Sequence, residues 1–198
     1  MLLCFAGGAV LLGRWHPAFV ASVTLVLSIA PLVLSRWAQV VVPPSFIAAI
    51  VLFVGGTLFL GEAFDFYERF WWWDIAMHGS SAVGFGLVGF VLIFMMFQGD
   101  TYAAPPWAVA LFAFSFAMAV GALWEVFEFA MDQLFGLNMQ KSGLLDTMGD
   151  LIVDAIGALV GAGSGWLYLR FQGRRGPMAL IEEFVRKNPR FFTRLRRK

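Results

Sequence analysis

Five long apolar segments limit what this chain can fold into. A helix that spans a bilayer needs about 20 mostly apolar residues, and lipid tolerates only helices and closed barrels as spanning structures. Hydrophobic residues make up 60% of the chain and charged residues only 14%, against about 25% charged in soluble domains. The sequence therefore predicts an all-α fold, a polytopic transmembrane helical bundle. The segments are residues 17–35, 45–60, 75–97, 106–131 and 151–169.

The segments outside these five are short and do not predict a separate folded domain. Residues 1–13 are apolar but short, so we expect five to six spans. They lack a basic region, so we expect no cleavable signal peptide. The connectors are short, which predicts a single transmembrane bundle over residues 1–170 and a basic, amphipathic tail over 171–198. Cys4 is the only cysteine, which excludes an intramolecular disulfide.

Basic residues predict how the chain is oriented. Ten of the fourteen Lys and Arg lie from Arg170 onward. By the positive-inside rule, the C-terminus is then cytoplasmic, and residues 61–74 and 132–150 face outward. The ten are Arg170, Arg174, Arg175, Arg186, Lys187, Arg190, Arg194, Arg196, Arg197 and Lys198.

Acidic residues and one histidine lie within or beside three of the apolar segments. A charged side chain near the middle of a helix in lipid costs roughly 2.5–3.5 kcal/mol, so such residues are candidates for a functional site. Their spacings put each group on one face of its helix. The residues are Asp74 and His78, then Glu125, Glu128 and Asp132, and then Asp146, Asp150 and Asp154.

The predicted topology places these groups at matched depths. From the outermost acid of each helix, the helical rise sets His78, Glu128 and Asp150 roughly 5–6 Å inward. The same rise sets Glu125 and Asp154 roughly 10–12 Å inward. We therefore predict that a side-chain oxygen of Glu125 or Glu128 lies within about 6 Å of a carboxylate of Asp150 or Asp154. His78 should border the same cavity.

The chemistry of this cluster favours a cation. Hard divalent cations bind carboxylate oxygens, and imidazole with carboxylates suits Zn, Mn or Fe. Without a cation, several acids must hold protons, as in proton-coupled carriers. The predicted cofactor is thus a divalent metal cation. Its predicted ligands are His78, Glu125, Glu128, Asp150 and Asp154, and the predicted catalytic residues are His78, Glu125 and Glu128.

Structural roles compete with these functional ones. Asp74 and Asp146 stand where helices begin and would complement the helix dipole there. Asp132 would be a solvated residue at a helix end. Gly157 and Gly161 form a GxxxG pattern, which indicates close packing of helices. The matching small residues on the His78 helix are Gly84, Gly86 and Gly89.

The tail has a helical, two-sided pattern. Met178, Ile181, Phe184 and Val185 share one face, and charged residues occupy the others. This predicts an interfacial helix that binds anionic lipid, at about 1 kcal/mol per basic residue near the surface. A role in setting topology is the simpler alternative. We expect membrane lipids as partners and no nucleic acid.

Five short motifs follow one another between residues 61 and 170. They are Phe66-Tyr67-Glu68-Arg69, Trp73-Asp74-x3-His78-x-Ser80, Gly121-x2-Trp124-Glu125-x2-Glu128-Phe129, Asn138-Met139-Gln140 and Asp146-Thr147-Met148-Gly149-Asp150-x3-Asp154-x2-Gly157-Ala158. Together they resemble the YjdF-like family of bacterial inner-membrane proteins, and the spacing alone is faintly similar to VanZ-like proteins. The resemblance implies a helical inner-membrane protein and no substrate. The signature positions it implies are His78, Glu125, Glu128, Asp146, Asp150 and Asp154.

Three functions fit these features. The first is an outward-facing carboxylate and histidine site that binds a divalent cation and acts on a lipid-linked or phosphate-bearing substrate. The second is a proton- or cation-coupled transporter that uses the same acids, for which this small bundle would form a homo-oligomer. The third is a non-catalytic accessory subunit whose polar residues bond helices together. The sequence leaves open whether the protein is an enzyme.

Overall fold

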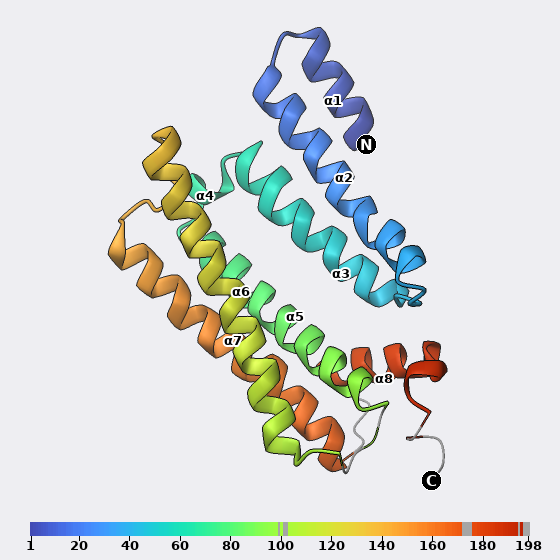
Figure 1. Ribbon diagram of the computed structural model, residues 1–198. Coiled ribbons are helices and arrows are strands. Elements are labelled where there is room, and N and C mark those ends of the chain that lie inside the picture. The colour runs from blue at the N-terminus through green and yellow to red at the C-terminus, as the bar shows by residue number, and fades with distance from the viewer. Residues whose placement is uncertain (99, 101–102, 172–175, 194, 196–198) are drawn as a thin grey trace. The chain divides into compact units, whose positions relative to one another are not determined.

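The computed structural model describes residues 1–98, 100, 103–171, 176–193 and 195 (Figure 1). Helices are the regular elements of this part of the chain, and the predicted all-α class is confirmed. Six basic residues of the predicted tail lie outside it: Arg174, Arg175, Arg194, Arg196, Arg197 and Lys198. The elements are α1 (Leu2–Leu11), α2 (Trp15–Trp37), α3 (Pro44–Val54), the π-helix η1 (Gly55–Glu62), α4 (Phe66–Arg69), α5 (Trp73–Met96), α6 (Pro106–Phe135), α7 (Leu144–Phe171), α8 (Pro177–Lys187) and the 3-10 helix η2 (Pro189–Phe191).

Five helical stretches are long and apolar enough to cross a membrane. They are α2, the continuous stretch Pro44–Glu62, α5, α6 and α7. The sixth apolar segment forms α1, whose ten residues are fewer than a span needs. α6 has 30 residues, a length of about 45 Å, so its ends extend beyond a hydrocarbon core about 30 Å thick.

Local sequence explains where the long helices begin and end. Proline occupies the first turn of α3, α6 and α8, where its missing N–H removes no helical bond. Gly136 ends α6 in the left-handed conformation, with φ 64°. α7 begins at Leu144, seven residues before the predicted start at 151. The apolar pattern missed this first part because Asp146 and Asp150 interrupt it.

The chain divides into two compact units, Met1–Met77 and His78–Lys198, which are described separately. The first holds α1 to α4 and the first residues of α5. There the Trp73 indole N–H donates to the Gly56 carbonyl oxygen of η1 at 3.3 Å. The Phe5 and Phe59 rings meet edge to face, with centroids 5.0 Å apart. The predicted single bundle over 1–170 with a separate tail stays a prediction.

In the second unit, α8 covers one end of the helical core. The ring of Phe94 on α5 packs at a tilt against that of Phe192, with ring centroids 5.3 Å apart. Ile181, on the apolar face of α8, is fully buried. The Tyr168 hydroxyl of α7 donates to Glu182 Oε2 at 2.9 Å. The predicted amphipathic helix is therefore present, and its apolar face packs within the protein, while binding of anionic lipid stays a prediction.

Candidate functional site

Glycines bring α7 against α5 in the second unit. A Cβ on Gly157 would overlap the Gly79 carbonyl oxygen, and one on Gly161 would crowd the Val83 carbonyl and the Cα of Gly86. The backbones of the two helices therefore touch, as the GxxxG pattern predicted. Of the three glycines on α5 that we expected to match this pattern, only Gly86 contacts the backbone of α7. Gly89 instead faces Phe116 and Ala113 of α6, and a Cβ on Gly84 would meet no atom within 4 Å.

Three buried side chains converge next to this contact, each from a different helix. His78 comes from α5, Glu125 from α6 and Asp150 from α7. One nitrogen or oxygen atom of each lies within 4.8 Å of the others. α6 and α7 run side by side along much of their length (Figure 1). The juxtaposition that helical periodicity predicted is thus present, and the roles of the residues stay predictions.

Asp154 completes the cluster from the next turn of α7, and its side chain is 1% exposed. Its Oδ1 lies 3.4 Å from His78 Nδ1, while Glu125 Oε1 lies 3.9 Å from His78 Nε2. The imidazole therefore stands between two carboxylates. Gly121 of α6 makes room for this arrangement, because a Cβ there would overlap the Asp154 carboxylate.

The deepest carboxylates have unmet hydrogen-bonding capacity. Within the part of the chain that the structure describes, neither oxygen of Glu125 and neither oxygen of Asp154 accepts a hydrogen bond. Buried polar atoms are nearly always bonded, so each exception calls for a physical explanation. A bound cation, a proton or a charged imidazole would each supply the missing partner.

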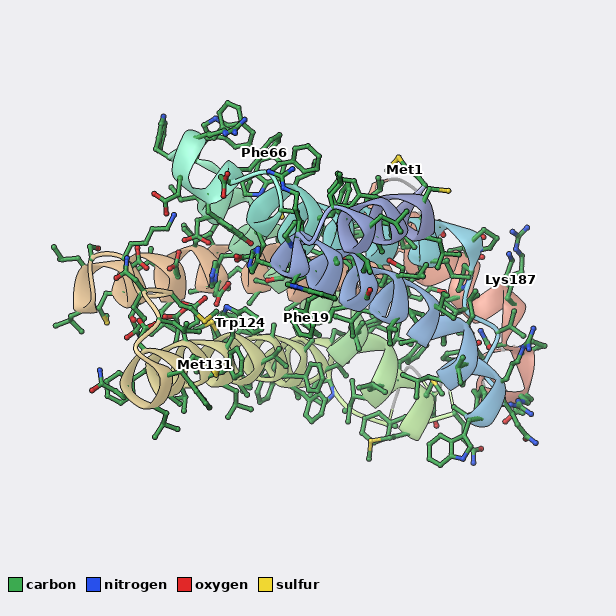
Figure 2. The ribbon with its side chains drawn as sticks, turned by 90° about the horizontal axis from the view of Figure 1, so that it is seen from above. Met1, Phe19, Phe66, Trp124, Met131 and Lys187 are labelled. Atoms are coloured by element: carbon green, nitrogen blue, oxygen red, sulfur yellow. The ribbon has the colours of Figure 1, made fainter. Side chains whose placement is uncertain are left out.

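Helical rise predicted a separate layer for each of the two buried acids of α6. We expected Glu128 in the layer of His78 and Asp150, with Glu125 one layer deeper. Instead Glu125 meets His78 and Asp150, and Glu128 Oε1 accepts a hydrogen bond of 2.8 Å from the Trp124 indole of its own helix. Figure 2 shows Trp124 on α6 near a group of side-chain oxygens between α6 and α7.

Two of the outer acids order the α6–α7 connector. Asp132 accepts hydrogen bonds from the backbone N–H groups of Met139 at 2.7 Å and Gln140 at 2.9 Å. Asp146 Oδ2 accepts one from the Lys141 N–H at 3.1 Å. The structural role expected for Asp146 therefore takes the form of a contact with the preceding connector. Asp132, expected as a solvated end residue, is half-buried and fixes this connector.

Asp74, which we expected to complement a helix dipole, lies in the first turn of α5 and belongs to the first unit.

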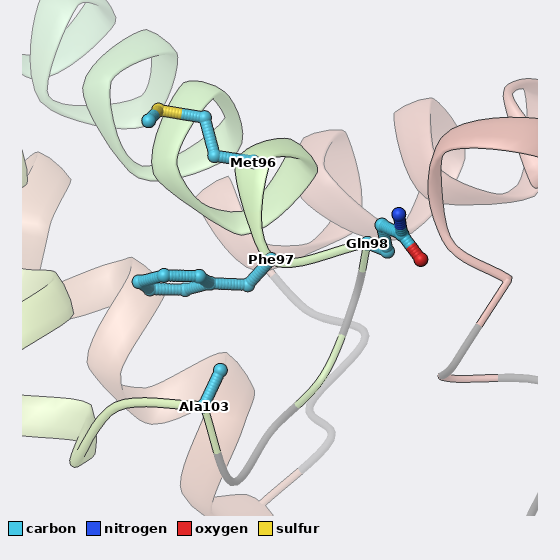
Figure 3. A pocket seen from close by; sticks show the side chains of 4 residues that line it. All are labelled: Met96, Phe97, Gln98 and Ala103. Carbon is cyan, nitrogen blue, oxygen red and sulfur yellow. The ribbon is translucent and has the colours of Figure 1, made fainter.

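Open pockets lie elsewhere on the described residues. One is at the α5–α6 connector, lined by Met96, Phe97, Gln98 and Ala103 (Figure 3). Met96 follows His78 by 18 residues on one helix, a distance of about 27 Å along the axis. The pocket is therefore separate from the polar cluster, which is enclosed by the helices themselves.

The five apolar helices and the enclosed polar cluster define a multi-spanning α-helical membrane protein. The chain belongs to the family described as "Predicted membrane protein (DUF2238)", whose model matches residues 1–171. This is the YjdF-like family, so the resemblance found in the motifs is confirmed.

A relative from Thermotoga maritima, described as "Uncharacterized protein", is 31% identical over 102 residues. The aligned part covers 50% of each protein, so the chain spans about half the length of the curated relative it matches. No solved structure matches this chain.

Proposed function

We propose that this protein binds a divalent cation within the membrane, between α5, α6 and α7. The observation that carries the proposal is the approach of His78, Glu125 and Asp150 to within 4.8 Å of one another. Ligands at about 2.0–2.2 Å from an ion lie at most about 4.4 Å apart across it. Small side-chain rotations would therefore place all three atoms on one ion.

The charges of the cluster support the same proposal. Glu125, Glu128, Asp150 and Asp154 are all buried, and the sequences of α5, α6 and the first part of α7 contain no Lys or Arg. Repulsion among ionised carboxylates in this medium is severe, which favours a bound cation or protons. Asp154 and Glu128 are the remaining carboxylates from which the shell of the ion would be completed. A set of oxygens with one imidazole suits Mn, Fe or Zn.

The reaction we propose for the site is cation-dependent hydrolysis of a lipid-linked or phosphate-bearing substrate in the outer leaflet of a bacterial inner membrane. The orientation rests on the basic residues after Arg170. A bound divalent ion supplies Lewis acidity and an activated water at neutral pH. His78 lies between Glu125 and Asp154 and would serve either as a ligand of the ion or, when it does not bind the ion, as a general acid or base beside it.

One observation favours a second function, cation- or proton-coupled transport. The cluster is enclosed, since its histidine and its four carboxylate residues are each 9% exposed or less. A small ion or a proton reaches such a site more readily than a phosphate ester does. Buried acids of this kind are typical of ion and proton pathways.

Metal content and thermal stability test the cation site. Purified full-length protein is assayed for bound metals beside Asp154→Asn, with the exposed carboxylate variant Asp65→Asn as a control. Manganese or zinc should copurify with the wild type and the control, and added ion should raise their melting temperature. If Mg, Mn, Zn and Ca all leave the melting temperature unchanged and no metal copurifies, the cation site is refuted.

Two assays then separate the functions. Manganese-dependent release of inorganic phosphate from phosphatidic acid or a polyprenyl diphosphate in nanodiscs supports hydrolysis. Uptake of manganese into sealed vesicles, reported by an enclosed metal-sensitive dye, supports transport. Glu125→Gln should abolish whichever activity is present.

A further inference from the structure

A chain of polar contacts leads from the α6–α7 connector to the enclosed cluster. It begins at Asp132, whose two oxygens hold the N–H groups of Met139 and Gln140 at 2.7 and 2.9 Å. With its backbone held, the Gln140 side chain reaches α7, where Nε2 donates to Thr147 Oγ1 at 2.6 Å. Hydrogen bonds thus link Asp132 to Gln140 and Gln140 to Thr147.

Thr147 is the last member of the chain, and its side chain lies near enough to the Glu125 carboxylate of α6 to interact with it. A threonine hydroxyl has one O–H to donate and lone pairs that accept. Because Gln140 donates to this oxygen, the Thr147 proton is available to a different acceptor. Neither oxygen of Glu125 accepts a hydrogen bond within the described chain, so Glu125 is the unmet acceptor beside this donor.

We propose that Gln140 and Thr147 are positioning residues of the cluster, which orient the Glu125 carboxylate toward His78 and Asp150. This inference rests on the proposed cation site and deepens it. A small rotation of Thr147 or Glu125 completes the hydrogen bond from the Oγ1 hydroxyl to a carboxylate oxygen. The other carboxylate oxygen then remains for the ion. Residues that hold ligands in this way commonly change metal affinity by about 10- to 100-fold when removed.

The arrangement gives the connector a role in the site. Asp132, Gln140 and Thr147 lie in or beside three of the short motifs, yet none of them belongs to the group of buried ligands. Their contacts explain why an amide, a hydroxyl and a carboxylate occur together at this end of α6 and α7. Asp132 holds the backbone of Gln140, the Gln140 amide holds the Thr147 hydroxyl, and Thr147 in turn would orient Glu125.

Manganese affinity, measured by electron paramagnetic resonance on the full-length protein in nanodiscs, tests the proposal. Thr147→Val keeps the shape of the side chain and removes the hydroxyl, and it should weaken binding about tenfold or more. Thr147→Ser restores the hydroxyl and should bind within about twofold of the wild type. Gln140→Met should weaken binding, and the double variant Gln140→Met with Thr147→Val should add little, since both act through one contact.

A matched control removes a hydroxyl from the same connector without touching the chain of contacts. Ser142 is exposed, so Ser142→Ala should bind manganese like the wild type. Wild-type affinity in Thr147→Val, or equal losses in Thr147→Val and Thr147→Ser, would overturn the positioning role.

Infrared spectroscopy distinguishes failure of this inference from failure of the cation site. The carboxyl band of Glu125 is assigned from the Glu125→Gln difference spectrum of the metal-free protein. Loss of a hydrogen bond from Thr147 should shift that band in Thr147→Val and leave it in place in Ser142→Ala. If the wild type binds no manganese, the proposed cation site is refuted. The infrared band of Glu125 still tests the positioning role in that case, and a band that does not shift in Thr147→Val refutes that role.

Discussion

The Asp154 carboxylate of α7 lies against the backbone of Gly121 on α6, at a point where a Cβ atom would overlap it. Gly121 precedes Glu125 by one turn on the same helix. Because Gly121 lacks a side chain, the Asp154 carboxylate can approach α6 one turn before Glu125, which lies next to His78. The polar cluster therefore depends on the glycine at position 121 as well as on its charged residues.

Gly121→Ala should therefore damage the cluster. The added methyl group must displace Asp154 or separate α6 from α7, at a cost of about 1–3 kcal/mol for overpacking. We expect a lower melting temperature and weaker manganese binding. Gly163→Ala on α7 is the control, because its Cβ meets no atom within 4 Å and alanine favours the helix. Equal behaviour of the two variants would contradict the close fit of Asp154.

Removing one buried charge should have opposite effects with and without metal. In metal-free protein at neutral pH, Glu125→Gln and Asp154→Asn relieve repulsion among the carboxylates, so each should melt higher than the wild type. With manganese, the wild type should gain stability through binding, and both variants should lose most of that gain. Differential scanning fluorimetry measures both effects. A metal-free destabilisation of both variants would show that the His78 ion pairs outweigh the repulsion.

Metal binding should weaken as the pH falls, because the ligands must lose their protons to bind an ion. Protons and the ion compete for the same imidazole and carboxylate atoms, so binding releases protons and is favoured at higher pH. The stabilisation given by manganese should therefore be largest at high pH and decline as the pH falls. Calorimetry in two buffers with different ionisation enthalpies counts the protons released. Binding that takes up protons would contradict ligation by His78.

Close packing between α5 and α7 predicts a steric effect at one glycine. Gly161→Val should lower the melting temperature strongly, because the added side chain would meet the Val83 carbonyl and the Cα of Gly86. Gly163→Val, two residues further on, has open space and should be close to neutral apart from its helix propensity. The comparison isolates the packing effect. Similar losses in both variants would point to the helix itself.

The proposed orientation is tested by labelling the α6–α7 connector. Ser142 is exposed in it, so Ser142→Cys, with Cys4 replaced by Ser, should react with a membrane-impermeant maleimide in intact cells. A cysteine placed in the C-terminal tail should react only after permeabilisation. The reverse pattern would place the connector in the cytoplasm and remove outward access to the cluster.

Apolar length and helical periodicity accounted for much of this structure. The predicted segment 75–97 corresponds to α5 at Trp73–Met96, and 106–131 to α6, which begins at Pro106. The π-helix Gly55–Glu62 could not be foreseen, because a π-helix and an α-helix have similar apolar patterns.

For the site, periodicity identified the faces that carry Glu125, Asp150 and Asp154. It did not identify that Glu125 would join His78 and Asp150, because it predicted Glu125 to lie one layer deeper than those two residues. The connector contacts of Asp132 were missed because they join side chain to backbone across a turn, and no repeat in the sequence encodes them.

The residues of the cluster come from three separate helices, and this has a consequence for insertion of the protein into the membrane. During synthesis, α5 and α6 enter the bilayer before α7 exists, and α6 then carries Glu125 without Asp150, Asp154 or the full cluster. A carboxylate near the centre of a lone helix costs roughly 2.5–3.5 kcal/mol on insertion scales. That cost is offset only after α7 arrives. Release of α6 into lipid should therefore wait for α7, so that biogenesis delivers the three helices as a group.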